Sequence, residues 1–213
     1  MLCGTLAVWA VANVLAGLAA WNRYQLLLAL PSEHVPRGSE ALVTADMWLG
    51  NLLGWREAAF VISMLLLIAW LDDMRGRADG AWPQGQRRSR AWLIFAWVLP
   101  VGNLFIPKMF VNDLWAAGQP AQRRKRGHPL LTVWWLAVIV AFGWSGAALG
   151  RVRETAYAGP GAAAMRQVMQ SSGLFIVAAV LTIAVVWKLS GMLERTVASR
   201  IGDLPGAPPS ATG

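Results

Sequence analysis

Five long runs of apolar residues, separated by polar segments, dominate the chain. The runs cover residues 2–22, 47–71, 91–107, 130–150 and 167–187. A helix needs about 20 apolar residues to cross a bilayer core about 30 Å thick. We therefore predict an all-α integral membrane protein with a single membrane domain at 1–201 and a disordered cytoplasmic tail at 202–213.

The third run differs from the others because it holds residues that interrupt a helix. Pro100 lacks a backbone N–H, and Gly102 and Asn103 tolerate left-handed backbone. Pro107, at the end of the run, disfavours helix at the residue before it. We expect a broken or re-entrant intramembrane segment at 91–107 within a bundle of four full transmembrane helices. Five spans are the alternative.

The positions of lysine and arginine favour the re-entrant arrangement. With the N-terminus inside, it places 13 of these residues inside and 6 outside, whereas five spans divide them 11 to 8. Short cytoplasmic loops carry the excess of positive charge in membrane proteins. The count predicts a multi-pass protein of the bacterial plasma membrane with both termini cytoplasmic.

Two of the loops between the runs are strongly basic. Clusters of lysine and arginine beside membrane segments attract anionic lipid headgroups. We predict contacts with the lipid bilayer, with anionic headgroups or with another membrane protein, and no nucleic acid because further readout elements are missing. The candidate contact residues are Arg87, Arg88, Arg90, Arg123, Arg124, Lys125 and Arg126.

Composition and motifs argue against an enzyme. The chain is 56% apolar and only 14% charged, and it holds 13 Trp but a single cysteine, Cys3. Soluble domains carry about 25% charged residues. His34 and His128 stand far apart and form no metal-ligand spacing. We predict no catalytic residue, no metal and no cofactor.

A second group of candidate residues surrounds the expected break. The stretch Phe105–Ala117 has the pattern of an amphipathic helix that lies in the interface plane. Unwound backbone often marks a binding site in transporters, and Asn103 would be the polar ligand here. The candidate intramembrane polar site comprises Pro100, Gly102, Asn103, Pro107, Lys108 and Asp113.

Arg56 and Glu57 are charged residues within the second run. We interpret them as an interfacial start to that span, with Met47–Trp55 on the membrane surface. On this interpretation no span carries a central charge. In the first run, small residues recur every four positions and predict a face where helices meet, at Ala12, Ala16 and Ala20.

The stretch from Arg87 to Pro120, RRSRAWLIFAWVLPVGNLFIPKMFVNDLWAAGQP, has an unusual spacing of Pro, Asn and Trp. It resembles an actinobacterial membrane-protein family catalogued as domain of unknown function 4328, and the resemblance covers about residues 45–195. Asp79 departs from the family pattern, which commonly has Asn there. The resemblance implies an integral protein of the plasma membrane and no known activity, cofactor or substrate.

Two functional hypotheses follow from these features. The first is a non-enzymatic interaction or scaffold protein that uses its basic cytoplasmic loops. The alternative is a small permeation or lipid-handling pathway around the broken helix at Pro100–Pro107.

Overall fold

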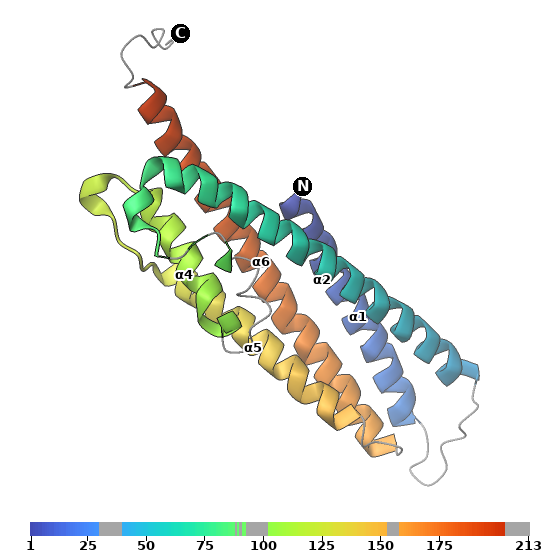
Figure 1. Cartoon of the computed structure of the whole chain (residues 1–213). Coiled ribbons are helices and arrows are strands. Elements are labelled where there is room, and N and C mark those ends of the chain that lie inside the picture. Colours follow the sequence, from blue (N-terminus) through green and yellow to red (C-terminus); the bar gives the residue numbers. More distant parts are fainter. Residues whose placement is uncertain (30–39, 88, 90, 93–101, 153–157, 203–213) are drawn as a thin grey trace. The chain divides into compact units, whose positions relative to one another are not determined.

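The computed structural model describes residues 1–29, 40–87, 89, 91–92, 102–152 and 158–202, and all regular structure within them is helical (Figure 1). The elements in chain order are α1 (Leu2–Ala29), α2 (Glu40–Ala81), the 3-10 turn η1 (Pro83–Gly85), α4 (Gly102–Ala117), the 3-10 turn η2 (Ala121–Arg123), α5 (Pro129–Val152) and α6 (Ala158–Gly202).

Four of these helices are long and apolar enough to cross a membrane. The qualifying helical segments are Leu2–Ala29, Glu40–Ala81, Pro129–Gly146 and Gly161–Ser199. Each corresponds to one of the four predicted full spans, so the all-α membrane-embedded class is confirmed. The long helices α1, α2 and α6 extend beyond the apolar runs because a charged residue ends a hydrophobic run without ending the helix.

Helix α2 corrects the interpretation of the second run. It runs without interruption from Glu40 to Ala81, so Met47–Trp55 is part of one long helix and is no separate surface segment. Leu42 and Leu49, which precede Arg56, are both buried in a core cluster with α1 and α6. The burial of this early part of the helix explains the continuity, because packing adds to the local helix propensity.

Helix α4 corrects the expected role of Pro107. Helix starts at Gly102 and continues through Ile106 and Pro107 to Ala117, so Pro107 does not interrupt it. Pro107 is the sixth residue of α4, so its missing N–H removes one backbone hydrogen bond, and the helix continues through it. Residues 93–101, which include Pro100, lie outside the described residues, and the re-entrant segment stays a prediction.

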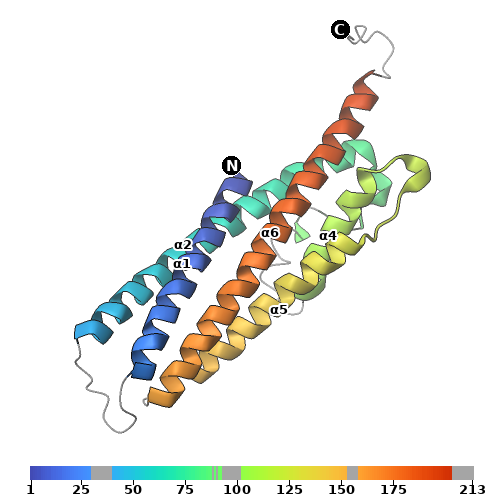
Figure 2. The same cartoon turned by 180° about the vertical axis from the view of Figure 1, so that it is seen from behind.

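The chain comprises two compact units, which share helices α2, α5 and α6. Unit 1 contains residues 1–64 and 136–183. Within it α1 and the first part of α2 run antiparallel, as Figures 1 and 2 show. The predicted small-residue face of α1 is buried, with Ala16 and Ala20 fully covered, and Ala20 packs in the core cluster beside Ala164 of α6.

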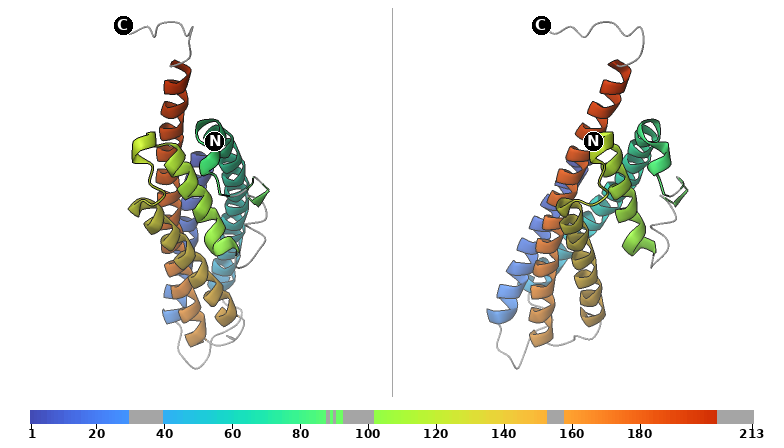
Figure 3. Two further views of the ribbon diagram at one scale, coloured as in Figure 1. Left: turned by 60° about the vertical axis from the view of Figure 1, so that its left-hand side comes forward. Right: turned by 90° about the vertical axis from the view of Figure 1, so that its left-hand side faces the viewer.

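Unit 2 contains residues 65–135 and 184–213. Helix α4 lies beside the last part of α6 in this unit (Figure 3), where Lys188 stands over the Trp115 ring at 5.5 Å. The Thr196 hydroxyl donates to the Gly118 carbonyl at 3.2 Å. Leu114 is fully buried. Helix α4 is therefore a packed element of unit 2. It confirms a helix over Phe105–Ala117, and the place of this helix in the membrane interface stays a prediction.

Candidate functional site: an arginine cluster around Asp113 and Trp82

Asp113 on α4 is the buried centre of a charge network in unit 2. Its side chain is only 2% exposed, and it accepts hydrogen bonds from the Arg87 Nε at 2.9 Å and from the Arg87 backbone N–H at 3.3 Å. The Arg126 Nε stands 3.3 Å from the same carboxylate. A carboxylate at this depth is stable only with partners, so these two arginines explain its burial.

The Trp82 ring, just after α2, carries the second part of the network. The guanidinium carbons of Arg124 and Arg126 lie 4.6 Å and 5.3 Å from the ring centroid, which is cation–π distance. Arg126 also donates to the Gly85 carbonyl at 3.1 Å. A Cβ atom at Gly85 would lie only 2.1 Å from the Trp82 ring. Glycine is therefore required where the η1 turn passes the indole.

Arg75 on α2 joins this network from the other side of η1, although sequence reasoning missed it. It is 6% exposed, its Nε lies 3.1 Å from the Asp79 carboxylate, and its NH1 donates to the Gln86 Oε1 at 2.6 Å. The i, i+4 spacing of Arg75 and Asp79 is a signal that could have indicated the pair. Gln86, which accepts from Arg75, directly precedes Arg87, which pairs with Asp113. The ion pairs of Asp79 and Asp113 are therefore linked through two neighbouring residues.

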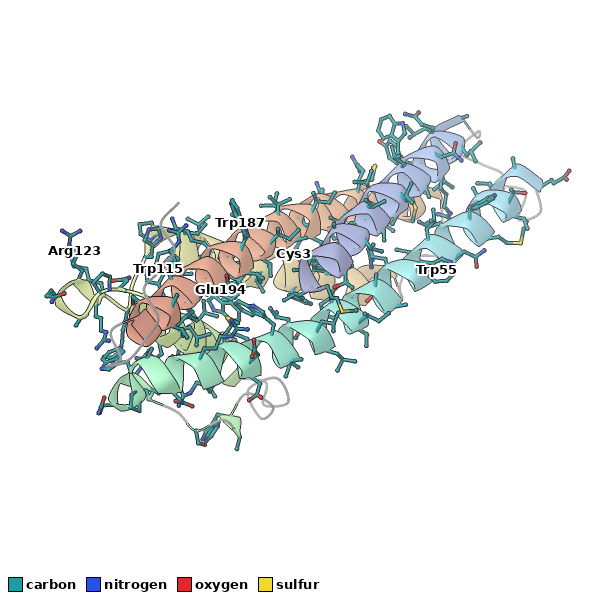
Figure 4. The ribbon with its side chains drawn as sticks, turned by 90° about the horizontal axis from the view of Figure 1, so that it is seen from above. Cys3, Trp55, Trp115, Arg123, Trp187 and Glu194 are labelled. Atoms are coloured by element: carbon teal, nitrogen blue, oxygen red, sulfur yellow. The ribbon has the colours of Figure 1, made fainter. Side chains whose placement is uncertain are left out.

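The basic run 123–126 divides into two faces. The Gln119 side chain holds the backbone of Lys125, accepting from its N–H at 3.0 Å and donating to its carbonyl at 3.3 Å. Arg124 has extended backbone, and in extended chain successive side chains point to opposite sides. Arg124 and Arg126 accordingly turn to Trp82, although 45% of the Arg126 side chain stays exposed, and Arg123 and Lys125 are exposed as well. Figure 4 shows Arg123 pointing away from the ribbon.

The cluster has an excess of positive charge. It contains four arginines, Arg75, Arg87, Arg124 and Arg126, but only two carboxylates, those of Asp79 and Asp113. Arg123 and Lys125 add two exposed cations at its edge. The Arg124 Nε is buried without a hydrogen-bond partner in the described part of the chain. Such an arrangement attracts anions and offers donors to them.

The structure brings together residues that the sequence placed in two separate groups. Asp113 was expected at the entrance of a polar pathway, and it instead pairs with Arg87 and Arg126 from the basic loops. The predicted polar face of α4 is wrong in this respect, because the ion pairs allow Asp113 to be buried. Lys108, on the same helix, is half-buried.

Several predicted site residues remain untested. Arg88, Arg90 and Pro100 lie outside the described residues, as does the side chain of Asn103. The backbone of Gly102 and Asn103 opens α4. The pathway around Pro100–Pro107 therefore stays a prediction. Within the described ranges, no group of three or more His, Cys, Asp or Glu side chains could hold a metal ion.

The fold and this cluster define an all-helical, membrane-embedded protein with a basic region in unit 2. The sequence model of the family described as Domain of unknown function (DUF4328) matches residues 33–195. The chain belongs to this family, and the resemblance noted from residues 87–120 is confirmed. Searches of curated proteins and of solved structures gave no significant match to this chain.

Proposed function

We propose that the protein is a non-enzymatic interaction protein of the bacterial plasma membrane that holds anionic lipid headgroups through its basic cytoplasmic loops. The observation that carries the proposal is the division of the run 123–126 into two faces. Arg124 and Arg126 build the folded cluster, and Arg123 and Lys125 are left free for an external anion. The loop therefore presents two cations at fixed positions.

Contacts between the two basic loops support a common side of the membrane for both. Arg87, before the third apolar run, pairs with Asp113 after it, and Arg126 reaches back to the Gly85 carbonyl. Because Arg87 and Asp113 are in contact, the described residues on the two sides of the third run lie close together, which favours a re-entrant path over a full crossing. The positive-inside count favours the cytoplasmic side for both loops.

The proposal predicts a division of roles between the two faces of the run. Each lysine or arginine near an anionic surface contributes about 1 kcal/mol, so the double variant R123Q/K125Q should bind anionic lipid about 30-fold more weakly. The measurement is the affinity of the purified full chain, in neutral detergent, for short-chain phosphatidylglycerol. Short-chain phosphatidylcholine provides the uncharged comparison and should bind both proteins alike.

Two control variants separate this role from net charge and from folding. R166Q/R195Q removes the same number of charges elsewhere, from two exposed side chains, and should keep phosphatidylglycerol binding. R124Q/R126Q should lower the thermal stability, because these arginines build the cluster. Wild-type affinity in R123Q/K125Q, or an equal loss in R166Q/R195Q, would contradict the proposal.

A further inference from the structure

Arg56 in unit 1 is a largely buried cation within the predicted span 47–71. Its side chain is 12% exposed, and its guanidinium carbon lies 5.9 Å from the centroid of the Phe175 ring on α6. The Nε and NH2 groups both donate to one Glu57 oxygen, at 3.1 Å and 2.7 Å. The NH1 group takes no part in that pair. A charged side chain inside a membrane bundle marks a functional site by default.

The register of α1 against α2 places Arg56 level with Asn13. Arg23 pairs with Asp46, and the Trp9 and Phe60 rings lie 5.4 Å apart. These two contacts are 14 positions apart along each helix, which fixes an antiparallel register through the segment between them. Ten positions after Asp46 is Arg56, and ten before Arg23 is Asn13.

Asn13 is fully buried and only half satisfied. Its Nδ2 donates to the Trp9 carbonyl at 2.9 Å, but its Oδ1 has no hydrogen-bond partner among the residues described. An amide oxygen without a partner in an apolar medium is unfavourable, because nothing there replaces the hydrogen bond that it makes to water. Sequence reasoning overlooked Asn13 because it counted only charged residues within the spans.

Ser172 on α6 approaches the same turn of α1. Its side chain is 2% exposed, and its Oγ also has no partner in the described ranges. Gly17, one helical turn after Asn13, brings the two helices together, because a Cβ there would lie 3.6 Å from the Ser172 Cβ and 3.9 Å from its Oγ. Ser172 in turn precedes Phe175, the ring that Arg56 faces, by one turn.

A layer of four aromatic rings lies beside Asn13 and Arg56. Trp9, Phe60, Phe142 and Phe175, from four helices, lie 5.3–5.4 Å apart between ring centroids. The centres of the four predicted spans are positions 12, 59, 140 and 177, each within three residues of one ring. By this register Arg56 lies one helical turn from the ring layer, and we infer that the second span carries a central charge.

We propose that Arg56, Asn13 and Ser172 form a hydrated site within unit 1, in which bound water links the three side chains. Asn13 Oδ1 requires a donor, Arg56 NH1 can donate, and the Ser172 hydroxyl serves as either. An anion offers only acceptors and would leave Asn13 unpaired, whereas a cation would be repelled by Arg56. Water meets all three demands, and buried waters typically make about three such bonds.

The test is radiolytic hydroxyl-radical footprinting of the full chain in lipid nanodiscs, with H2¹⁸O as the solvent. Radicals formed from bound water oxidise neighbouring rings and transfer the heavy oxygen to them. Trp9 and Phe175 are each 6% exposed, so solvent cannot reach them from the surface. We expect both to take up ¹⁸O several-fold faster than Trp144, which is 45% exposed on the surface of unit 1.

The variant N13L/S172A removes the polar atoms that would hold the water. It should lose most of the label at Trp9 and Phe175, with Trp144 unchanged. Wild-type protein in which Trp9 and Phe175 stay unlabelled would overturn the proposal, and this arm does not depend on the folding of any variant. Equal labelling of the two rings in wild type and variant would overturn it too, because the label would then come from another route.

Discussion

Single residues in unit 2 decide whether the arginine cluster can form. The Trp82 ring is held between the η1 turn on one side and the cations of Arg124 and Arg126 on the other. Only glycine fits at position 85, since any side chain atom there would overlap the ring. The buried carboxylate of Asp113 forms ion pairs with Arg87 and Arg126 and so fixes both side chains near this turn.

The substitution Gly85→Ala tests this contact. The new methyl group would lie 2.1–2.4 Å from three atoms of the Trp82 ring, so the ring must move and the cation–π contacts are lost. Overpacking of this kind costs about 1–3 kcal/mol. The thermal unfolding temperature of the purified protein in detergent should fall accordingly.

Gly80→Ala is the matched control for that substitution. Gly80 lies near the end of α2, and a Cβ there would meet no atom within 4 Å. Alanine is favoured over glycine in a helix by about 0.5–1 kcal/mol, so this variant should be as stable as wild type or slightly more so. Equal unfolding temperatures for Gly85→Ala and Gly80→Ala would show that Trp82 does not restrict position 85.

The sequence predicted some of these residues but not their pairing. Arg87, Arg126 and Asp113 were candidates, because charges beside apolar runs stand out. Their pairing depends on contacts across at least 13 positions of chain, which no local pattern encodes. The level of Arg56 relative to α1 likewise depends on the register between α1 and α2, which the sequence of α2 alone does not contain.

At the scale of elements, the loop between α4 and α5 has a defined structure because the Gln119 side chain makes the hydrogen bonds that a neighbouring backbone would otherwise make. Gln119 makes two hydrogen bonds to the backbone of Lys125, as a neighbouring strand would. These bonds hold the extended backbone in which Arg124 turns inward and Lys125 outward. Without them the division of the basic run into two faces would be lost.

Gln119→Ala should therefore loosen this loop. Each lost hydrogen bond contributes about 0.5–1.5 kcal/mol, and at an exposed site a total of about 1 kcal/mol raises the open population about fivefold. Limited trypsin digestion should cleave after residues 123–126 faster by that factor. Gln84→Ala, at an exposed side chain outside the loop, is the control and should leave the rate unchanged. Unchanged cleavage in Gln119→Ala would contradict this role.

Element prediction from the sequence succeeded for the four long helices and failed at two places. Apolar runs of about 20 residues identify membrane helices well, because length and hydropathy alone decide membrane insertion. Pro107 was taken as a break, but near the start of α4 it removes only one hydrogen bond. The burial of Asp113 was not predicted, because the arginines that neutralise it lie in other segments.

At the scale of the whole molecule, the central claim is that the segments before and after the third apolar run lie on one side of the membrane. The pairs Arg87–Asp113 and Arg126–Gly85 join these segments within unit 2. A common side makes them one basic surface, which the proposed lipid contact requires. Two opposite sides would separate Arg87 from Asp113 by the bilayer.

The most direct test is the accessibility of single cysteines to an impermeant maleimide on intact cells. Cys3 is first replaced by serine, and Gln84→Cys and Gln122→Cys are made separately, because both side chains are exposed and avoid the Gly85 contact. Our account predicts that both cysteines are shielded in intact cells and react together once the cells are opened. Labelling of one and not the other from outside would mean five spans and would contradict it.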